Sequence, residues 1–158
     1  MIAGHLRSAA LKYAAQGLSV FPCKPRGKTP LTKHGLKDAT CDLDQIKAWW
    51  DRWPEANVAI ATGAISGTIV LDVDPRHGGD DSLATLEASF GKLPETPTVL
   101  TGGGGLHIYF RHPGIEIPNS AGRVGPGIDV RGDGGYVIAP PSIHASGNEY
   151  LWKRPARI

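Results

Sequence analysis

Apolar residues recur at helical spacing in the first third of the chain. The first stretch predicts an amphipathic helix over residues 3–16, with Gly17 just beyond its end, where a left-handed conformation commonly terminates a helix. The second begins at Asp42, which stands in capping-box spacing with Gln45, and it ends before Pro54. A proline- and lysine-rich loop over residues 22–40 separates these two predicted helices.

Short β-branched or apolar runs, bounded by glycine and proline, predict strands along the rest of the chain. These runs cover residues 18–21, 57–61, 68–74, 98–101, 106–110, 127–131, 135–139 and 149–152. A third helix, capped by Asp80 or Asp81 and ended by Gly91, interrupts the strands. Helices at the front and a run of strands behind predict an α+β domain with a largely antiparallel sheet.

Three predicted strands carry charged residues on one face. Because residues i and i+2 project from the same face, Asp72 and Asp74 lie together, opposite Leu71 and Val73. Neighbouring carboxylates repel unless a cation, a proton or solvent separates them, so this pair at the end of an apolar strand indicates a divalent metal site. The alternative is a pair of solvated carboxylates where Pro75 starts a turn.

The strand over residues 106–110 places His107 and Tyr109 opposite an apolar face. An imidazole there could donate to a phosphate or bind a metal. The four glycines at 102–105 would let backbone amides approach a bound ligand closely, although such a run also forms flexible hairpin connections.

The strand over residues 127–131 repeats the pattern, with Asp129 and Arg131 opposite Ile128 and Val130. One interpretation is a surface salt bridge between Asp129 and Arg131, which would be worth little. The other is that the three strands share one functional face. Carboxylates would then hold divalent metal ions while cations grip phosphates, as phosphoryl transfer requires. That face would carry Asp72, Asp74, His107, Asp129 and Arg131.

Composition adds two features to this pattern. Glycine and proline make up 34 of the 158 residues, and glycine reaches nearly twice its usual share of about 7%, while 41% hydrophobic content argues against disorder. Eleven of the 21 glycines lie within residues 102–135. The net charge of +2 is unevenly distributed, because residues 1–50 hold eight Lys or Arg against three Asp.

Five cations and no acid lie between Lys24 and Lys37. This patch could face phosphates, or it could be a solvated loop. Trp49 and Trp50 could offer a stacking surface for bases, but their helical spacing favours a place in the core.

The chain fits one domain, residues 1–158, with no run of about 18 apolar residues and no secretory signal pattern. We therefore expect a cytoplasmic protein without a membrane partner. Cys23 and Cys41 are too few for a disulfide framework or a four-cysteine zinc site, so no zinc is expected.

These residues also resemble a known family, the N-terminal primase-polymerase (prim-pol) domains of bifunctional DNA primase/polymerases in the archaeo-eukaryotic primase superfamily, from about residue 9 to residue 152. Its motifs are an acidic pair on an apolar strand, a small residue two positions before a histidine, and an apolar residue before an acid. They are matched in order by Asp72-Val73-Asp74, Gly105-Leu106-His107 and Ile128-Asp129. Further matches are residues 24–30, 49–54 and 139–142.

The resemblance implies roles for several residues. Asp72, Asp74 and Asp129 would bind the catalytic Mg²⁺ or Mn²⁺, and His107 would contact the phosphates of the incoming nucleotide. Further phosphate contacts would come from Lys28, Arg123 and Arg131. It also implies a compact αβ unit packed on a strand-rich unit resembling an RNA-recognition motif, with the active site between them.

The main hypothesis is therefore a template-directed DNA primase/polymerase that uses nucleoside triphosphates and a single-stranded DNA template in phage, plasmid or mobile-element replication. Some relatives carry a zinc-binding stem, for which this sequence has no Cys/His cluster. Many relatives also need a following helical segment or helicase domain, which we expect to lie in a longer polypeptide. The alternatives are a non-catalytic nucleotide or single-strand binding module and a metal-dependent phosphodiesterase.

Overall fold

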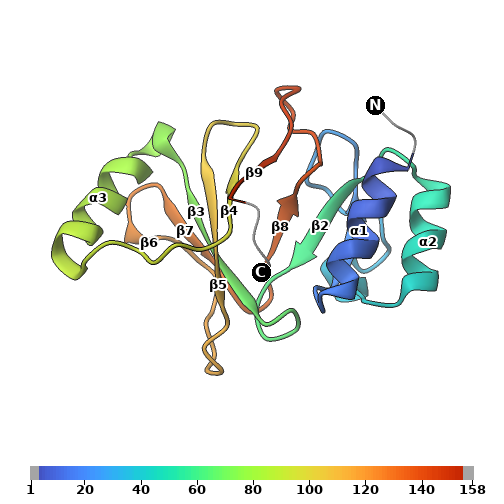
Figure 1. Ribbon diagram of the computed structural model, residues 1–158, viewed down its shortest axis with the longest axis horizontal. Coiled ribbons are helices and arrows are strands. Elements are labelled where there is room, and N and C mark those ends of the chain that lie inside the picture. Colours follow the sequence, from blue (N-terminus) through green and yellow to red (C-terminus); the bar gives the residue numbers. More distant parts are fainter. Residues whose placement is uncertain (1–3, 155–158) are drawn as a thin grey trace.

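The computed structural model describes residues 4–154 and consists of two units that lie side by side (Figure 1). In the smaller unit, α1 (His5–Ala15) and α2 (Leu43–Arg52) pack against a three-stranded antiparallel sheet. The sheet has the order β1 (Val20–Cys23), β2 (Asn57–Ala61), β8 (Tyr136–Ala139). A short 3-10 helix, η1 (Gly35–Asp38), lies in the loop that leads from β1 to α2.

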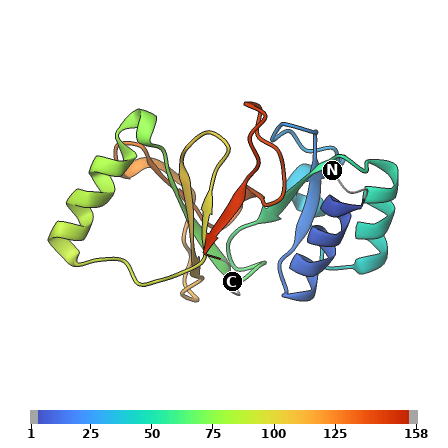
Figure 2. The same cartoon turned by 45° about the horizontal axis from the view of Figure 1, so that its top comes forward.

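The larger unit is a six-stranded antiparallel sheet with α3 (Gly79–Phe90) at one end of it (Figure 2). From edge to edge its strands are β6 (Ser120–Gly125), β7 (Ile128–Arg131), β3 (Thr68–Val73), β5 (Leu106–Arg111), β4 (Thr98–Leu100) and β9 (Leu151–Arg154). A second short 3-10 helix, η2 (Pro75–His77), connects β3 to α3. The chain crosses between the two sheets in the β2–β3, β7–β8 and β8–β9 connections. The α+β class and the largely antiparallel pairing predicted from the sequence are confirmed.

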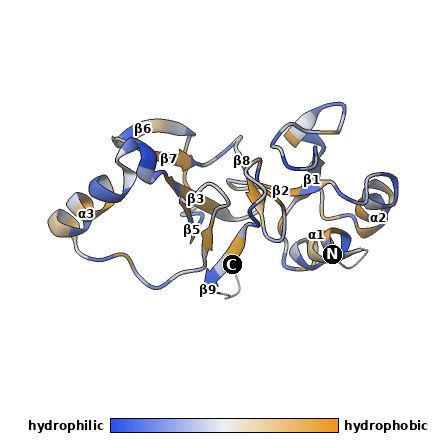
Figure 3. Cartoon of the chain, turned by 90° about the horizontal axis from the view of Figure 1, so that it is seen from above, coloured by the Kyte–Doolittle hydropathy of each residue, from blue (hydrophilic) through white to orange (hydrophobic). Residues whose placement is uncertain are grey.

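Two hydrophobic clusters hold the fold together. The larger one joins α1, α2, the small sheet and one face of the large sheet, where Val70, Val99 and Tyr109 are buried. The smaller one, around Val73 and Ile108, lies on the opposite face of the large sheet under α3. Figure 3 shows apolar residues along strands of both sheets, whereas α3 carries mixed colouring.

The alternation predicted for β3 and β5 is confirmed, because Val73 and Ile108 lie on the face opposite to Val70 and Tyr109. The second face, however, is not simply polar, since Tyr109 is only 1% exposed. The large sheet is covered on this face by the smaller unit, so its charged residues lie at the border of a buried surface.

Several boundaries differ from the sequence prediction for identifiable reasons. The first strand runs two residues later than expected and includes Pro22, which an edge strand tolerates because an edge position leaves one side of the backbone unpaired. β6 was not predicted, since its glycines and a register shift against β7 hide any strand pattern. The N-cap of α3 is Gly78 in a left-handed conformation, not Asp80 or Asp81, which lie in the first turn.

Other local predictions are confirmed. Asp42 caps α2 by accepting a hydrogen bond from the backbone NH of Asp44 at 3.0 Å. Gly17, with a φ of 86°, follows α1, and the NH groups of Gly17 and Leu18 return to the last turn of that helix. The predicted start of this helix at residue 3 lies outside the described residues. No helix within residues 4–154 combines the length and the apolar character needed to cross a membrane.

Candidate active site

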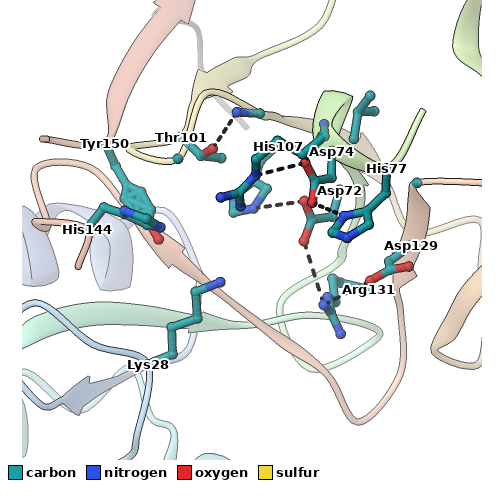
Figure 4. Close-up of a pocket in the computed structure, with 15 residues that line it drawn as sticks. Lys28, Asp72, Asp74, His77, Thr101, His107, Asp129, Arg131, His144 and Tyr150 are labelled. Atoms are coloured by element: carbon teal, nitrogen blue, oxygen red, sulfur yellow. Dashed lines mark hydrogen bonds and ion pairs between the residues drawn. The ribbon is translucent and has the colours of Figure 1, made fainter. Parts of the chain in front are cut away.

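A cavity of about 370 Å³ lies where the two units meet. The large sheet contributes Asp72 from β3, His107 from β5, and Asp129 and Arg131 from β7 (Figure 4). Lys28 reaches it from the loop after β1. His144 and Tyr150 come from the segment between β8 and β9. The site therefore takes residues from both units, as the resemblance implied.

The central position of β3 explains why the three sequence motifs converge. β3 pairs with β5 on one side and with β7 on the other, and the register places Asp72 directly opposite His107 and directly opposite Asp129. Cross-strand partners have Cβ atoms about 4.5–5.5 Å apart. An acid, an imidazole and a second acid thus form one row across three strands.

Asp72 is a partly buried carboxylate held between an imidazole and a guanidinium. Its Oδ1 lies 3.6 Å from Nε2 of His107, and its Oδ2 lies 3.6 Å from Nη2 of Arg131. Burial would raise the pKa of the Asp72 carboxyl, but the contact with His107 and the charge of that ring lower it. The charges of Arg131 and Lys28 act in the same direction, so the pKa lies below its ordinary value and the group is ionised at neutral pH.

Arg131 links the two facing acids, because its Nη2 also lies 3.3 Å from Oδ2 of Asp129. The salt bridge considered from the sequence therefore exists, and it extends to Asp72 as well. With the Arg131 side chain 37% exposed, the pair is screened by solvent. A positive charge between two acids offsets their mutual repulsion.

Asp74 lies at the same cavity but makes local contacts. One oxygen accepts a hydrogen bond from the backbone NH of Arg76 at 2.9 Å, and the other lies 2.7 Å from Nδ1 of His77. The hydrogen bond with His77 is the main reason that the pKa of Asp74 is lowered, and the contacts with Arg76 add to it. These contacts agree with the second interpretation of the sequence for Asp74, in which the carboxylate lies at the start of a turn.

The end of β3 is packed backbone against backbone. Gly127 has a φ of 76°, and a Cβ atom there would lie 2.4 Å from the backbone nitrogen of Gly79 and 2.8 Å from the carbonyl oxygen of Asp74. A Cβ on Gly105 would lie 2.6 Å from the carbonyl oxygen of Val73. These glycines permit the close approach that places the acids at one cavity.

His107 is almost fully buried and is stacked against Tyr150, with ring centroids 6.2 Å apart and an interplanar angle of 28°. Burial, and secondarily the charge of Asp72, raises the pKa of Tyr150 to about 12, so its hydroxyl is protonated at neutral pH. Within residues 4–154 the Nδ1 atom of His107 has no hydrogen-bond partner. The ring is thus positioned by Asp72 and Tyr150.

Lys28 and His144 lie in two loops joined by one buried side chain. The amide of Asn57, which is 1% exposed, donates to the carbonyl oxygens of Gly27 at 3.0 Å and Ile143 at 2.8 Å. It also accepts a hydrogen bond from the NH of Ile143 at 3.0 Å. Asn57 therefore fixes the residue before Lys28 to the residue before His144.

Lys28 brings a positive charge to this side of the cavity. The described part of the chain contains no ion pair to Lys28. Burial lowers the pKa of His144, and the charges of Lys28 and Arg76 lower it further, so His144 is neutral at pH 7. A lysine without an acidic partner suits a polyanionic ligand, whose charge would stabilise the positive charge of Lys28.

The structure brings together six of the seven predicted site residues, namely Lys28, Asp72, Asp74, His107, Asp129 and Arg131. The seventh, Arg123, is exposed on β6 and does not line the cavity, so its contact with phosphates stays a prediction. Sequence reasoning missed Arg76, His77, His144 and Tyr150. Only Arg76 and His77 carried a signal, because they directly follow the acidic motif.

The donor set at the cavity fits a hard divalent cation in kind, since Mg²⁺ and Mn²⁺ prefer carboxylate oxygens. The guanidinium between Asp72 and Asp129 shows that a positive charge is accommodated there. In residues 4–154, however, no three His, Cys, Asp or Glu side chains are grouped as a bound metal requires, and both oxygens of Asp74 contact Arg76 and His77. The assignment of three metal ligands therefore stays a prediction.

An α+β fold with a charged cavity, where two facing acids lie with Lys28 and Arg131, fits a class of protein that handles phosphate-bearing ligands. The sequence matches the family described as bifunctional DNA primase/polymerase, N-terminal, over residues 10–158, and the chain belongs to this family. The match implies nucleotidyl transfer of the primase/polymerase kind in general, with DNA and nucleotides as the class of substrate. A comparison with curated proteins gave no match.

Proposed function

We propose that this domain transfers nucleotidyl groups from nucleoside triphosphates to a 3′-hydroxyl on a single-stranded DNA template. The observation that carries the proposal is the row of Asp72, His107 and Asp129 across three strands, with Arg131 between the two acids. These residues lie at one cavity with Lys28, to which residues 4–154 offer no ion pair. The family match supports the class of reaction.

In this proposal Asp72 and Asp129, with Asp74, hold Mg²⁺ or Mn²⁺, which would lower the pKa of the attacking hydroxyl and offset the charge of the leaving pyrophosphate. Lys28 and Arg131 bind the triphosphate oxygens through their positive charge. His107, fixed by Asp72 and Tyr150, orients a phosphate at the cavity wall. The narrow cavity and the stacked rings limit the positions that a nucleotide can take.

We further propose that the domain acts in phage, plasmid or mobile-element replication, together with a helicase. The support for this setting is the resemblance of the three motifs to prim-pol domains, not a feature of the cavity.

The test is extension of a labelled primer on a DNA template with Mg²⁺ or Mn²⁺ and either deoxy- or ribonucleoside triphosphates. Asp72→Asn removes the charge but keeps the shape, and we expect incorporation to fall by at least about 10²-fold, as for loss of a group that stabilises a transition state. Asp80→Asn, an exposed acid in the first turn of α3, is the matched control and should keep full activity.

Other results would contradict the proposal in different ways. Triphosphate binding without incorporation by the wild-type chain would favour a binding module. Loss of label from the nucleic acid without added triphosphates would favour a phosphodiesterase that uses the same acids. Equal incorporation by wild type and Asp72→Asn would exclude Asp72 from the reaction.

A further inference from the structure

A second cavity, of about 820 Å³, lies in the smaller unit between α2 and the basic loop that precedes it. Trp49 and Trp53 line it from α2 and its C-cap, and Lys33 and His34 line it from the loop. We call this cavity the tryptophan groove. Among residues 4–154, none lines both this groove and the candidate active-site cavity, which we call the catalytic cavity.

The two tryptophans of α2 and the one at its C-cap have different environments. Trp50 is 1% exposed and its indole NH donates to the carbonyl oxygen of Ala56 at 3.0 Å, so it belongs to the core as the helical spacing predicted. Trp49 and Trp53 are only partly buried, and both border the groove. Both indoles also pack against the hydrophobic core, so only the part of each ring that borders the groove could contact a ligand.

Both cations and acids line the groove. Its two acids make local hydrogen bonds, because Asp38 accepts one from the backbone NH of His34 at 2.8 Å and Asp42 caps α2. Lys33 and Arg52 form no salt bridge in the described part of the chain. The guanidinium of Arg52 lies 4.6 Å from the ring centroid of Trp53, where it adds positive charge beside an aromatic surface.

Aromatic side chains beside cations form the usual binding surface for single-stranded nucleic acid, because bases stack on the rings while cations follow the backbone. A DNA duplex would leave the indoles without a partner, since its bases are stacked internally. A free triphosphate offers one base for two indoles.

The groove is also close to the catalytic cavity along the chain. Lys28 lines the catalytic cavity and Lys33 lines the groove, and five residues span at most about 18 Å even when fully extended. One strand of DNA can therefore contact both.

We propose that the tryptophan groove binds the single-stranded template outside the catalytic cavity. The purpose of this binding rests on the proposed function, whereas the binding itself can be tested without any nucleotide incorporation.

The test measures the fluorescence anisotropy of a labelled oligo(dT) of about 16 nucleotides, the upper end of known single-strand site sizes, with a chelator and without triphosphates. Trp49→Ala and Trp53→Ala should each weaken binding about 5- to 150-fold, the loss expected for one stacked base. Lys33→Glu changes an exposed side chain, so it tests the groove without disturbing the core.

Matched controls lie at the opposite end of the molecule, on and beside α3 (Figure 1). Phe90→Ala removes an aromatic ring that is 85% exposed, and Lys92→Glu reverses an exposed charge. Both should bind oligo(dT) as the wild type does. The groove variants should also raise KM for template but leave KM for triphosphate unchanged.

Unchanged oligo(dT) affinity in Trp49→Ala, Trp53→Ala and Lys33→Glu would overturn the proposal. Equal binding of a duplex, weakened by the same substitutions, would overturn the assignment to a single strand. If the wild type incorporates no nucleotide but the groove variants lose oligo(dT), the proposed function fails and the groove stands. If incorporation is intact and oligo(dT) binding is unaffected, the groove alone fails.

Discussion

Asp72 and Asp129 are direct cross-strand partners on β3 and β7, and a single nitrogen of Arg131 lies within 3.6 Å of an oxygen of each. Like charges directly opposite each other destabilise a sheet. The guanidinium compensates this repulsion in the folded protein. The same position between the two acids is where the proposed function needs a divalent cation.

The first prediction concerns the replacement of the Arg131 guanidinium by a divalent cation between Asp72 and Asp129. Arg131→Met should lower stability in a chelating buffer by about 0.5–1 kcal/mol, as for a solvent-screened pair, which is about 1–4 °C in Tm. Added Mn²⁺ should raise the Tm of Arg131→Met more than that of wild type, since the acids then lack their internal cation. Thermal unfolding with and without Mn²⁺ measures both effects.

Arg111→Met is the control, because Arg111 is an exposed arginine at the end of β5. Its response to Mn²⁺ should equal that of wild type. If Arg131→Met gains no more from Mn²⁺ than Arg111→Met does, the two facing acids do not share a cation site.

The second prediction concerns the backbone packing at the end of β3. Gly127→Ala should destabilise the protein by about 2–4 kcal/mol, because the new Cβ would meet the backbone of Gly79 and Asp74 and the residue would keep a positive φ. Gly114→Ala is a matched control with a φ of 86° and nothing within 4 Å of the added atom. In urea unfolding, an equal loss in both variants would mean that φ alone matters.

The third prediction separates positioning from stability. Asn57→Ala should cost about 1–3 kcal/mol, because it leaves partly buried backbone groups of Gly27 and Ile143 without this partner. It should also raise KM for triphosphate, since Lys28 and His144 lose their common anchor. Thr68→Val removes another buried hydrogen bond, to Phe110, away from the cavity. That variant should lose stability with KM unchanged, and a KM shift of the same size would refute the positioning role of Asn57.

The fourth prediction is a pH dependence of stability. The carboxylate of Asp133 accepts hydrogen bonds from the backbone NH groups of Ala64 and Ile117, both at 2.8 Å, and these bonds, with His112, lower its pKa. A lowered folded-state pKa stabilises the protein above the unfolded pKa of about 3.9, and this contribution disappears as the pH falls through the folded-state value.

Asp133→Asn should therefore be less stable than wild type at pH 7, and the difference should shrink as the pH falls below about 4. Urea unfolding over this pH range measures it. A difference that stays constant down to pH 3 would show that the charge of Asp133 does not act through these hydrogen bonds.

The alternation of residues along a strand is what made much of the site predictable. Asp72, His107 and Asp129 each lie on a short apolar strand, so the alternation of side chains predicted the face of the strand that each occupies. The three motifs together suggested that they share one face of the sheet. The sequence did not contain the register that places all three in one row, because pairing depends on which strands become neighbours.

Residues in turns were harder to predict. His144 and Tyr150 reach the cavity because the segment between β8 and β9 is fixed by Asn57 and by the glycines at 102–103, and such long-range contacts leave no local pattern. Arg123 was assigned by charge and glycine-rich context, neither of which determines where an edge strand points.

The pairing of β8 with β2 has a consequence for synthesis of the protein. β2 ends at Ala61, but the strand that completes its sheet begins at Tyr136. During translation, one side of β2 therefore stays unpaired until β3 to β7 have been synthesised and β8 follows them. The smaller unit, although its first strands are made first, is therefore completed only by a strand that follows β3 to β7 along the chain, and the larger sheet is completed by β9 after that.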